Sequence, residues 1–156
     1  MGQFYSNSKD LLEKINAIRK NKKVVFTNGC FDLLHIGHVK YLKEAKSKGD
    51  FLIVGINADA SVKRLKGPTR PIQNENDRSE ILAALESVDA TVIFTEDTPE
   101  NLIKMVHPDV LVKGGDWKIN QIVGGEFVQG YGGQVLSLMF IDGKSTTSIV
   151  SKIEKS

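Results

Sequence analysis

Five short runs dominated by apolar residues recur along this chain, and they constrain its fold more than any other feature. The run at residues 51–56, FLIVGI, has no polar alternation at all. Such strands are typical of parallel sheets covered by helices on both faces. Segments with apolar residues at helical spacing separate the runs, which predicts an α/β fold built on a doubly wound parallel sheet with right-handed crossovers. The five expected strands are residues 24–27, 51–56, 90–94, 109–112 and 134–138.

Helices are expected between these strands. Ser8 is the expected N-cap of the first helix, and Pro99 falls in the first turn of another. The helical patterns cover residues 8–20, 37–47, 75–87, a segment from Pro99, a short piece before residue 134 and a C-terminal stretch from Ser145, whereas residues 58–73 are expected to form a polar loop. Because no linker or repeat interrupts the alternation, we expect one Rossmann-like domain, 1–156, with an N-terminal helix (1–22) and a core (23–156).

Composition excludes several classes of protein. The net charge is only +2, with 40% hydrophobic and 26% charged residues, and no basic run or basic amphipathic segment is present. We therefore expect neither a nucleic-acid nor a membrane partner. The single cysteine, Cys30, cannot form an intramolecular disulfide, and the N-terminus lacks the apolar core of a signal peptide. A cytoplasmic protein is expected.

The segment TNGCFDLLHIGH, residues 27–38, follows the first expected strand and leads into a helix. His35 and His38 are three residues apart, so they share one side of the first turn, where backbone N–H groups favour an anion. Gly29 and Gly37 permit a close approach of the backbone to a ligand. The alternatives are two surface histidines or half of a metal site. Zinc is disfavoured because the only cysteine lies in the same loop. The candidate nucleotide-binding residues are Thr27, Asn28, Gly29, Phe31, Asp32, His35 and His38, and the two histidines are also candidate catalytic residues.

A second candidate phosphate cradle is DGKSTT, residues 142–147. Hydroxyl and N–H groups of Ser145, Thr146 and Thr147 at the start of the last helix could face the first cradle. The simpler interpretation is that Ser145 or Thr146 serves only as an N-cap.

Cationic side chains gather in residues 63–70, KRLKGPTR, and again at Arg78. Most such loops are merely solvated. A mobile cationic loop can also close over a phosphorylated substrate and neutralise a leaving group. Lys66 and Arg78 are therefore candidate catalytic residues, and Arg70 is a candidate substrate ligand.

Two further strand ends carry candidate ligands. In LVKGGDW, residues 111–117, the glycines let the backbone approach a base or ribose, so Lys113, Gly115 and Asp116 are candidate nucleotide ligands. Trp117 could stack on a ring or simply pack. Asn57 and Asp59 end the second strand, and a simple Asx turn is the alternative there.

Taken together, the runs NGCFDLLHIGHVKYL, KRLKGPTRPI, EDTPENLI and VKGGDW resemble the HxGH nucleotidylyltransferases. Within that family the chain is most similar to the branch of adenylyltransferases that form ADP-heptose. The resemblance implies that His35 and His38 contact the triphosphate of ATP and stabilise a pentavalent transition state, without a covalent intermediate. It also places the 111–117 stretch at the nucleotide and Asn57 and Asp59 near the acceptor.

The resemblance further implies heptose 1-phosphate as acceptor, Mg²⁺ bridging the ATP phosphates, and a homodimer. DGKSTT is similar to the ISTT motif of the cytidylyltransferase branch, but Phe140 stands where that branch has an arginine, with Lys144 as a partial substitute. Without a kinase domain before the motif, we expect a standalone enzyme or an excised domain. The alternatives are cytidylyl transfer to a polyol phosphate, adenylyl transfer to FMN, and a non-catalytic nucleotide-binding module.

Overall fold

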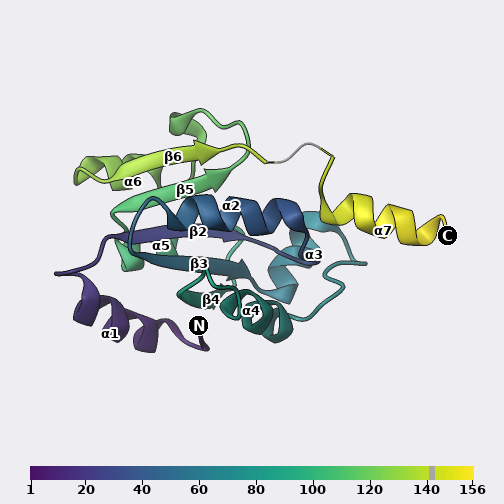
Figure 1. Ribbon diagram of the computed structural model, residues 1–156, viewed down its shortest axis with the longest axis horizontal. Coiled ribbons are helices and arrows are strands. Elements are labelled where there is room, and N and C mark those ends of the chain that lie inside the picture. Colours follow the sequence, from purple (N-terminus) through teal and green to yellow (C-terminus); the bar gives the residue numbers. More distant parts are fainter. Residues whose placement is uncertain (141–142) are drawn as a thin grey trace.

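The computed structural model describes residues 1–140 and 143–156, so Asp142 of the predicted 142–147 cradle lies outside the described residues. Six parallel strands form one sheet in the order β1-β4-β3-β2-β5-β6 (Figure 1). Their bounds are β1 Gln3–Tyr5, β2 Val24–Gly29, β3 Phe51–Asn57, β4 Ala90–Phe94, β5 Val110–Gly114 and β6 Gln134–Leu138.

The prediction of five strands was wrong by one, because β1 lies in the segment where only a helix was expected. This strand has three residues, and it pairs with Ala90–Val92 of β4 at the edge of the sheet. A run this short shows no periodicity of its own, and pairing with a distant strand defines it. The other five strands and the doubly wound parallel architecture are confirmed.

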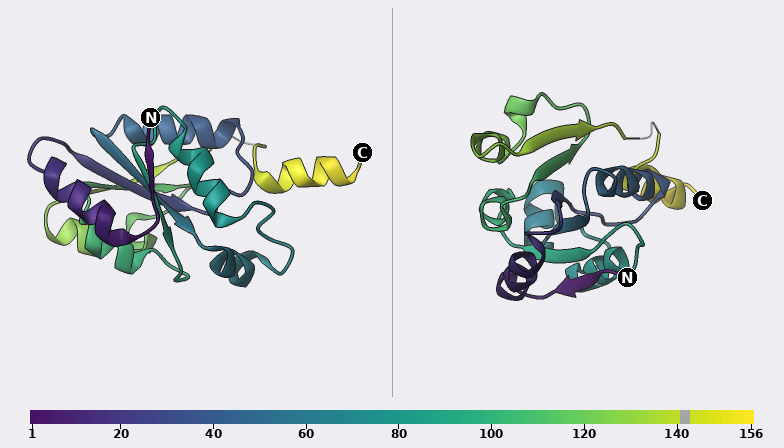
Figure 2. Two further views of the ribbon diagram at one scale, coloured as in Figure 1. Left: turned by 90° about the horizontal axis from the view of Figure 1, so that it is seen from below. Right: turned by 60° about the vertical axis from the view of Figure 1, so that its left-hand side comes forward.

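Helices cover both faces of the sheet (Figure 2). On one face, α1 (Ser8–Ile18), α5 (Glu100–Val106) and α6 (Gly125–Gly130) contribute apolar side chains to one core. On the other, α2 (Ile36–Lys46) and α4 (Glu75–Ala83) build a second core. All seven residues of β3 are buried between these layers, as expected for a strand without polar alternation.

Two details differ from the sequence-based expectations. The polar 58–73 segment is not all loop, because α3 (Asp59–Lys66) occupies its first half. Its buried face is narrow, with only Ser61 and Val62 inside, so the hydrophobic pattern was too weak to reveal it. The N-cap of α1 is Asn7, whose side chain accepts from the Asp10 N–H, rather than Ser8.

The C-terminal helix α7 (Thr146–Glu154) extends away from the sheet (Figures 1 and 2). The short 3₁₀ helix η1 (Ile119–Gln121) and α6 precede β6, which confirms the short helix expected there. None of the helices among residues 1–140 and 143–156 is long and apolar enough to cross a bilayer.

The strand order reverses beside β2. The chain runs outward from β2 through β3 to β4, and then returns to the opposite side of β2 to form β5 and β6. In open α/β sheets, ligands bind in the crevice beyond the carboxyl ends of the strands at such a reversal. Residues 28–29 and 113–114 lie at these ends.

Candidate functional site

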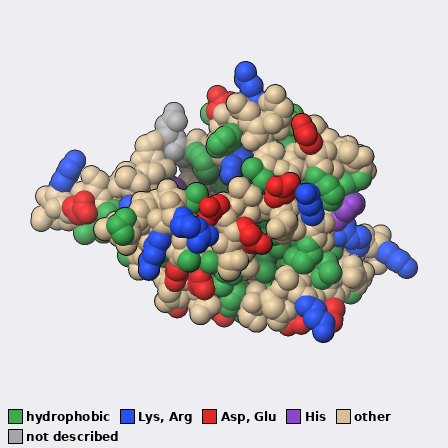
Figure 3. Space-filling view, turned by 180° about the vertical axis from the view of Figure 1, so that it is seen from behind, with side chains coloured by type: hydrophobic (Ala, Val, Ile, Leu, Met, Phe, Trp, Pro, Cys, Tyr) green, Lys and Arg blue, Asp and Glu red, His purple; other side chains and the backbone are tan. Residues whose placement is uncertain are grey.

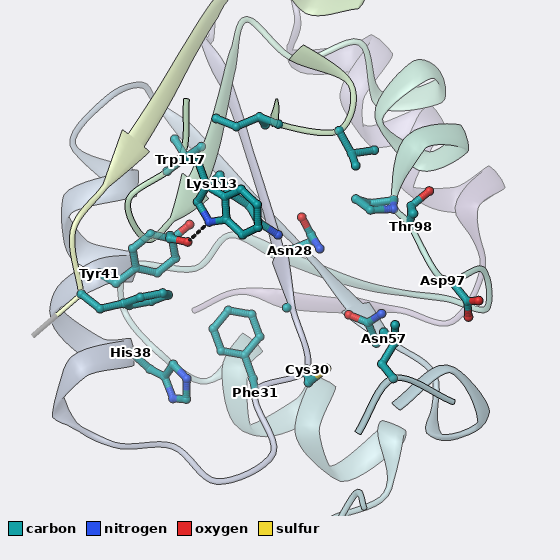
Figure 4. A pocket seen from close by; sticks show the side chains of 18 of the residues that line it. Asn28, Cys30, Phe31, His38, Tyr41, Asn57, Asp97, Thr98, Lys113 and Trp117 are labelled. Atoms are coloured by element: carbon teal, nitrogen blue, oxygen red, sulfur yellow. Dashed lines mark hydrogen bonds between the residues drawn. The ribbon is translucent and has the colours of Figure 1, made fainter. Parts of the chain in front are cut away.

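A cleft of about 440 Å³ opens at the carboxyl ends of the central strands (Figure 4). This volume lies within the range of small-molecule sites. Its walls come from segments far apart in the chain: Asn28–Asp32, His38, Tyr41, Asn57, Leu65, Lys66, Asp97–Pro99, Leu111–Gly114, Trp117, Gln121–Val123, Phe140 and Thr146. On the molecular face shown in Figure 3, basic and acidic side chains are interspersed rather than segregated.

His35 is the N-cap of α2, and its conformation is fixed by the next turn. Its Nδ1 accepts from the Gly37 N–H at 3.1 Å. Because Nδ1 is the acceptor, the ring proton of neutral His35 resides on Nε2, which becomes a hydrogen-bond donor. A Cβ on residue 37 would lie 2.9 Å from the His35 ring, so only glycine leaves room for this cap.

His38 stacks on His35 with ring centroids 3.8 Å apart, and Phe31 lies edge-on at 5.0 Å. Burial, followed by the nearby His35 and Lys66, lowers the pKa of His38 to about 4. Burial and Lys144 also lower the pKa of His35. Both rings are therefore neutral at pH 7. The buried His38 Nδ1 has no hydrogen-bond partner among the described residues, so a donor or acceptor from a ligand would satisfy it.

The end of β2, with Asn28 and Gly29, and the following loop, with Cys30 and Phe31, form the floor of the cleft. Phe31 has a φ of 46°, and a Cβ at Gly29 would lie 2.8 Å from its ring. Glycine at position 29 is thus required by the position of Phe31. Burial raises the pKa of the Cys30 thiol.

Two predicted members of this motif have internal contacts. Thr27 is fully buried and does not line the cleft, and its hydroxyl pairs with the Tyr41 hydroxyl at 2.5 Å. Asp32 is 3% exposed; its carboxylate accepts from the backbone N–H groups of Ile72 and Gln73 and pairs with Arg70 at 3.4 Å. These bonds fasten the 70–73 segment onto the motif.

Two lysines supply positive charge to the cleft from opposite sides of β2. Lys66 ends α3, and Lys113 lies near the end of β5 with its Nζ 5.5 Å from the centre of the Trp117 ring. Burial lowers the pKa of Lys113. Trp117 is itself held by its indole N–H, which donates to the Gly114 carbonyl at 2.9 Å.

Arg78 does not line the cleft, contrary to what a catalytic role would suggest. Its side chain is fully buried and donates to the carbonyls of Cys30 (2.7 Å) and Gln73 (3.0 Å) and to Asp59 Oδ1 (2.8 Å). It links the cleft floor to the start of α3, and Asp59 faces Arg78 instead of the cleft. Asn57, by contrast, lines the cleft.

Of the predicted second cradle, only Thr146 lines the cleft, and its hydroxyl donates to the Leu33 carbonyl at 2.9 Å. Ser145 is the N-cap of α7, accepting from the Ser148 N–H at 3.0 Å. Thr147 lies with Arg70 in a separate hollow beside α7. In the 111–117 stretch, Gly115 and Asp116 are not among the lining residues, whereas Lys113, Gly114 and Trp117 are.

Several lining residues were not predicted as ligands: Tyr41, Leu65, Asp97, Thr98, Ile122, Val123 and Phe140. Asp97 and Thr98 carry a signal that could have been used, since they follow a predicted strand at its carboxyl end. Phe140 packs against Gly114, where a Cβ would lie 2.3 Å from the ring, and its centroid is 5.3 Å from that of Tyr41. The glycine at 114 therefore accommodates an aromatic ring.

Comparisons with known proteins agree with this geometry. A model of the family described as Cytidylyltransferase-like matches residues 26–139. "Bifunctional protein HldE" of Geobacter sulfurreducens is 55% identical over 148 residues, covering 94% of this chain and 30% of that protein. The protein of the same name from Pseudomonas fluorescens is 56% identical over 146 residues, covering 94% of this chain and 31% of the other. The chain thus spans about 30% of the length of these curated relatives.

Two solved structures are similar. A lipopolysaccharide core biosynthesis protein from Thermoplasma volcanium matches with a TM-score of 0.62 and 30% identity, covering 80% of this chain and all of the other. A pantoate–beta-alanine ligase from Francisella tularensis matches with a TM-score of 0.64 and 17% identity, covering all of this chain and 79% of the other, which shows a common fold. The chain belongs to the cytidylyltransferase-like family of nucleotidyltransferases.

Proposed function

We propose that the chain transfers AMP from ATP to D-glycero-β-D-manno-heptose 1-phosphate, giving ADP-heptose and pyrophosphate for the lipopolysaccharide core. One observation supports this most strongly. The stacked neutral pair of His35 and His38 lies at the reversal of the strand order, and His38, Lys66 and Lys113 line one cleft. Neutral and cationic hydrogen-bond donors in a cleft that is partly shielded from water are suited to stabilise the negative charge that develops on a triphosphate.

In the proposed reaction, a phosphate oxygen of the sugar phosphate attacks the α-phosphorus of ATP. The bond between this phosphorus and the oxygen that bridges to the β-phosphorus breaks, and pyrophosphate leaves. His35 donates from Nε2, and His38 holds phosphate oxygens beside it. The Thr146 hydroxyl donates to the Leu33 carbonyl and so supports the loop before α2. Lys66 neutralises charge on the transferring phosphates. The protein contributes alignment and charge stabilisation, without a covalent intermediate.

The residues of the cleft fit a Mg²⁺ ion that arrives with the nucleotide. In residues 1–140 and 143–156, no group of three or more His, Cys, Asp or Glu side chains is placed to hold a metal. Phosphate oxygens would supply the ligands, as Mg²⁺ prefers at such sites. When bound, the ion would offset the negative charge of the β- and γ-phosphates.

Arg78 and Asp32 act indirectly in this proposal. Both side chains are buried and hold the backbone of the cleft floor and the 70–73 segment. We assign them positioning roles, with Arg70 and Asp59 as their partners. Lys113 and Asn57 are the strand-end ligands that remain directed to substrates.

The choice of ATP over CTP rests on the walls of the cleft. Trp117, Phe140, Ile122 and Val123 offer an apolar, partly aromatic surface on which a purine would bury more area than a pyrimidine. The resemblance of the sequence to adenylyltransferases that form ADP-heptose favours a heptose phosphate as the acceptor, and the similarity to a lipopolysaccharide core biosynthesis protein supports it. A separate kinase activity would supply this acceptor. The proposal also includes the cytoplasmic location and the homodimer that the sequence led us to expect.

Pyrophosphate release with a panel of ATP, CTP and GTP, each combined with heptose 1-phosphate or glycerol 3-phosphate, tests the assignment. We expect turnover with ATP and heptose 1-phosphate, and thermal stabilisation by ATP above that by CTP. Turnover with CTP and glycerol 3-phosphate alone would instead establish the polyol-phosphate alternative. Nucleotide binding without turnover of any pair would indicate a non-catalytic module.

A further inference from the structure

The cleft changes in chemical character from one side of β2 to the other (Figure 4). On the side of β5 and β6, its walls are the aromatic rings of Trp117 and Phe140 with Lys113 beside them. His35 and His38, which are proposed to bind phosphate, lie after β2 at the start of α2. On the side of β3 and β4, the walls carry Asn57 and Asp97, and the carboxylate of Asp97 would repel a phosphate. Amide and carboxylate oxygens accept hydrogen bonds from hydroxyl groups.

The part of the cleft lined by Asn57 and Asp97 is the β3–β4 arm. The Asn57 side chain is held in one orientation inside this arm. It is 4% exposed, its Nδ2 donates to Ser61 Oγ at 3.0 Å, and the Ser61 hydroxyl donates to the Glu96 carbonyl at 3.2 Å. With the amide nitrogen engaged, Oδ1 is left as an acceptor, and Figure 4 shows this oxygen directed toward the cavity. A buried acceptor at a fixed position favours a ligand whose hydroxyl group lies where it can donate to this acceptor, close to the floor of the cleft.

Asp97 lies at the rim of the same arm and is also held in place. Its Oδ1 accepts from Arg64 Nε at 2.7 Å, and Arg64 Nη2 donates to the Thr95 carbonyl at 2.8 Å. The side chain of Asp97 is 55% exposed. Among the hydrogen bonds of the described residues, only Oδ1 of this carboxylate is engaged, which leaves Oδ2 for a ligand.

We propose that Asn57 and Asp97 form the subsite for the hydroxyl groups of the acceptor sugar, with Asn57 binding the ring and Asp97 binding the exocyclic diol that distinguishes a heptose from a hexose. The proposal rests on the proposed function. An acceptor whose phosphate lies against Lys66 places its ring beside the deep Asn57 and its tail toward the rim, where Asp97 lies. Hydroxyl donors to a carboxylate form charge-assisted bonds, which gives Asp97 selectivity for a sugar with the longer tail.

The competing assignment gives this arm to the ribose of the nucleotide. The position of the aromatic wall argues against it, because Trp117 and Phe140 lie across β2 from Asn57 and Asp97. A base on that wall and an acceptor in the β3–β4 arm flank the phosphates from two sides. In-line displacement requires the attacking oxygen to lie opposite the departing pyrophosphate, and a base on the far wall leaves this approach to the acceptor.

The test compares Asp97→Ala with the wild type, using heptose 1-phosphate and β-D-mannose 1-phosphate, which ends in a single hydroxymethyl group. Glu96→Gln is a matched control, because this neighbouring acidic residue does not line the cleft. Arg64→Gln removes the ion pair and keeps the Asp97 carboxylate. The measurements are kcat/KM for each sugar at saturating ATP, and the KM for ATP.

We expect Asp97→Ala to lower kcat/KM for heptose 1-phosphate about tenfold while leaving mannose 1-phosphate nearly unaffected, the magnitude of one hydrogen bond to a charged, partly exposed group. The KM for ATP stays unchanged, Glu96→Gln behaves as the wild type, and Arg64→Gln retains most of the heptose preference. Asn57→Ala, with its folded state checked by thermal unfolding, lowers kcat/KM for both sugars.

An unchanged heptose preference in Asp97→Ala overturns the subsite. So does a rise in the KM for ATP of similar size, since this would place the ribose in the arm. Loss of preference in Arg64→Gln equal to that in Asp97→Ala also overturns it, because the ion pair alone would then be responsible. These outcomes leave adenylyl transfer intact in the wild type, whereas a wild type that turns over no sugar 1-phosphate with ATP overturns the proposed function and the subsite together.

Discussion

Lowering the pH should strengthen nucleotide binding, because the stacked histidines are neutral in the free protein and can take up a proton once a triphosphate lies against them. Burial lowers the pKa of both rings, and nearby Lys144 lowers that of His35 further, whereas His35 and Lys66 lower that of His38 further. His35 resists protonation at Nδ1, because this atom accepts from the Gly37 N–H. The proton is therefore expected on His38, whose buried Nδ1 lacks a partner among the described residues.

The size of the effect follows from the pKa of about 4 for His38 in the free protein. A phosphate charge at 4 Å interacts with imidazolium by about 4 kcal/mol at an effective dielectric constant of about 20, equivalent to about 3 pKa units. Solvent reaches part of this half-buried ring and screens the charge, so we expect a pKa of about 6 in the complex. Since binding raises the pKa, affinity increases as the pH falls, by about tenfold between pH 7 and pH 5.

Isothermal titration of Mg-ATP in two buffers of different ionisation enthalpy measures the proton directly. We expect uptake of about half a proton at pH 6, the midpoint of the expected titration in the complex. His38→Gln should lose this uptake, whereas His107→Gln is a matched control, because His107 stacks on Tyr131 and does not line the cleft. Protonation of the nucleotide itself is common to all three proteins. Equal uptake in the wild type and in His38→Gln would refute the reasoning.

Three substitutions probe the supports of the site. Gly37→Ala should reduce kcat by about 100-fold through displacement of the His35 ring, while the free energy of unfolding changes by less than about 1 kcal/mol. Pyrophosphate release measures the first effect and urea unfolding the second. Normal turnover would contradict the steric explanation. Arg78→Met should destabilise the fold by about 3 kcal/mol in urea unfolding, because it leaves Asp59 and two carbonyls without their partner; a change below about 1 kcal/mol would count against a positioning role. Thr146→Val should cost about 1 kcal/mol in ATP affinity, seen as a roughly fivefold higher Kd; unchanged affinity would remove Thr146 from the nucleotide site.

Much of the fold was predictable because five of the six strands carry their own signal. These five are long enough to show a mainly apolar run, and their alternation with helices indicates the parallel sheet. The edge strand Gln3–Tyr5 has no such signal, because its three residues gain their structure from pairing with β4. Helix α3 was missed since only two of its residues, Ser61 and Val62, are buried.

The candidate site was predictable where it depends on local geometry. His35, Gly37 and His38 follow one another within a turn, so sequence spacing was sufficient to place them together. Arg78 could not be placed in the same way, because its partners, Cys30, Gln73 and Asp59, include residues far from it in the sequence. Sequence spacing also says nothing about which face of a motif is buried.

For that reason the bond between the Thr27 and Tyr41 hydroxyls and the contacts of Asp32 with the 70–73 segment could not be predicted. The walls formed by Phe140, Ile122 and Val123 likewise became visible only once the sheet brought distant segments to one cleft. Tertiary packing, which no local pattern encodes, decided each of these positions.

Pyrophosphate release by the wild type and by His38→Ala, with ATP and heptose 1-phosphate, tests the central claim most directly. The variant should remain folded, as judged by thermal unfolding, because His38 is only partly buried and its Nδ1 makes no hydrogen bond to residues 1–140 or 143–156. We predict that its rate falls by about 10²- to 10³-fold, the usual effect of removing one donor that stabilises transition-state charge. Near-normal turnover in a folded His38→Ala protein would contradict the assignment of this histidine pair to the transferring phosphates.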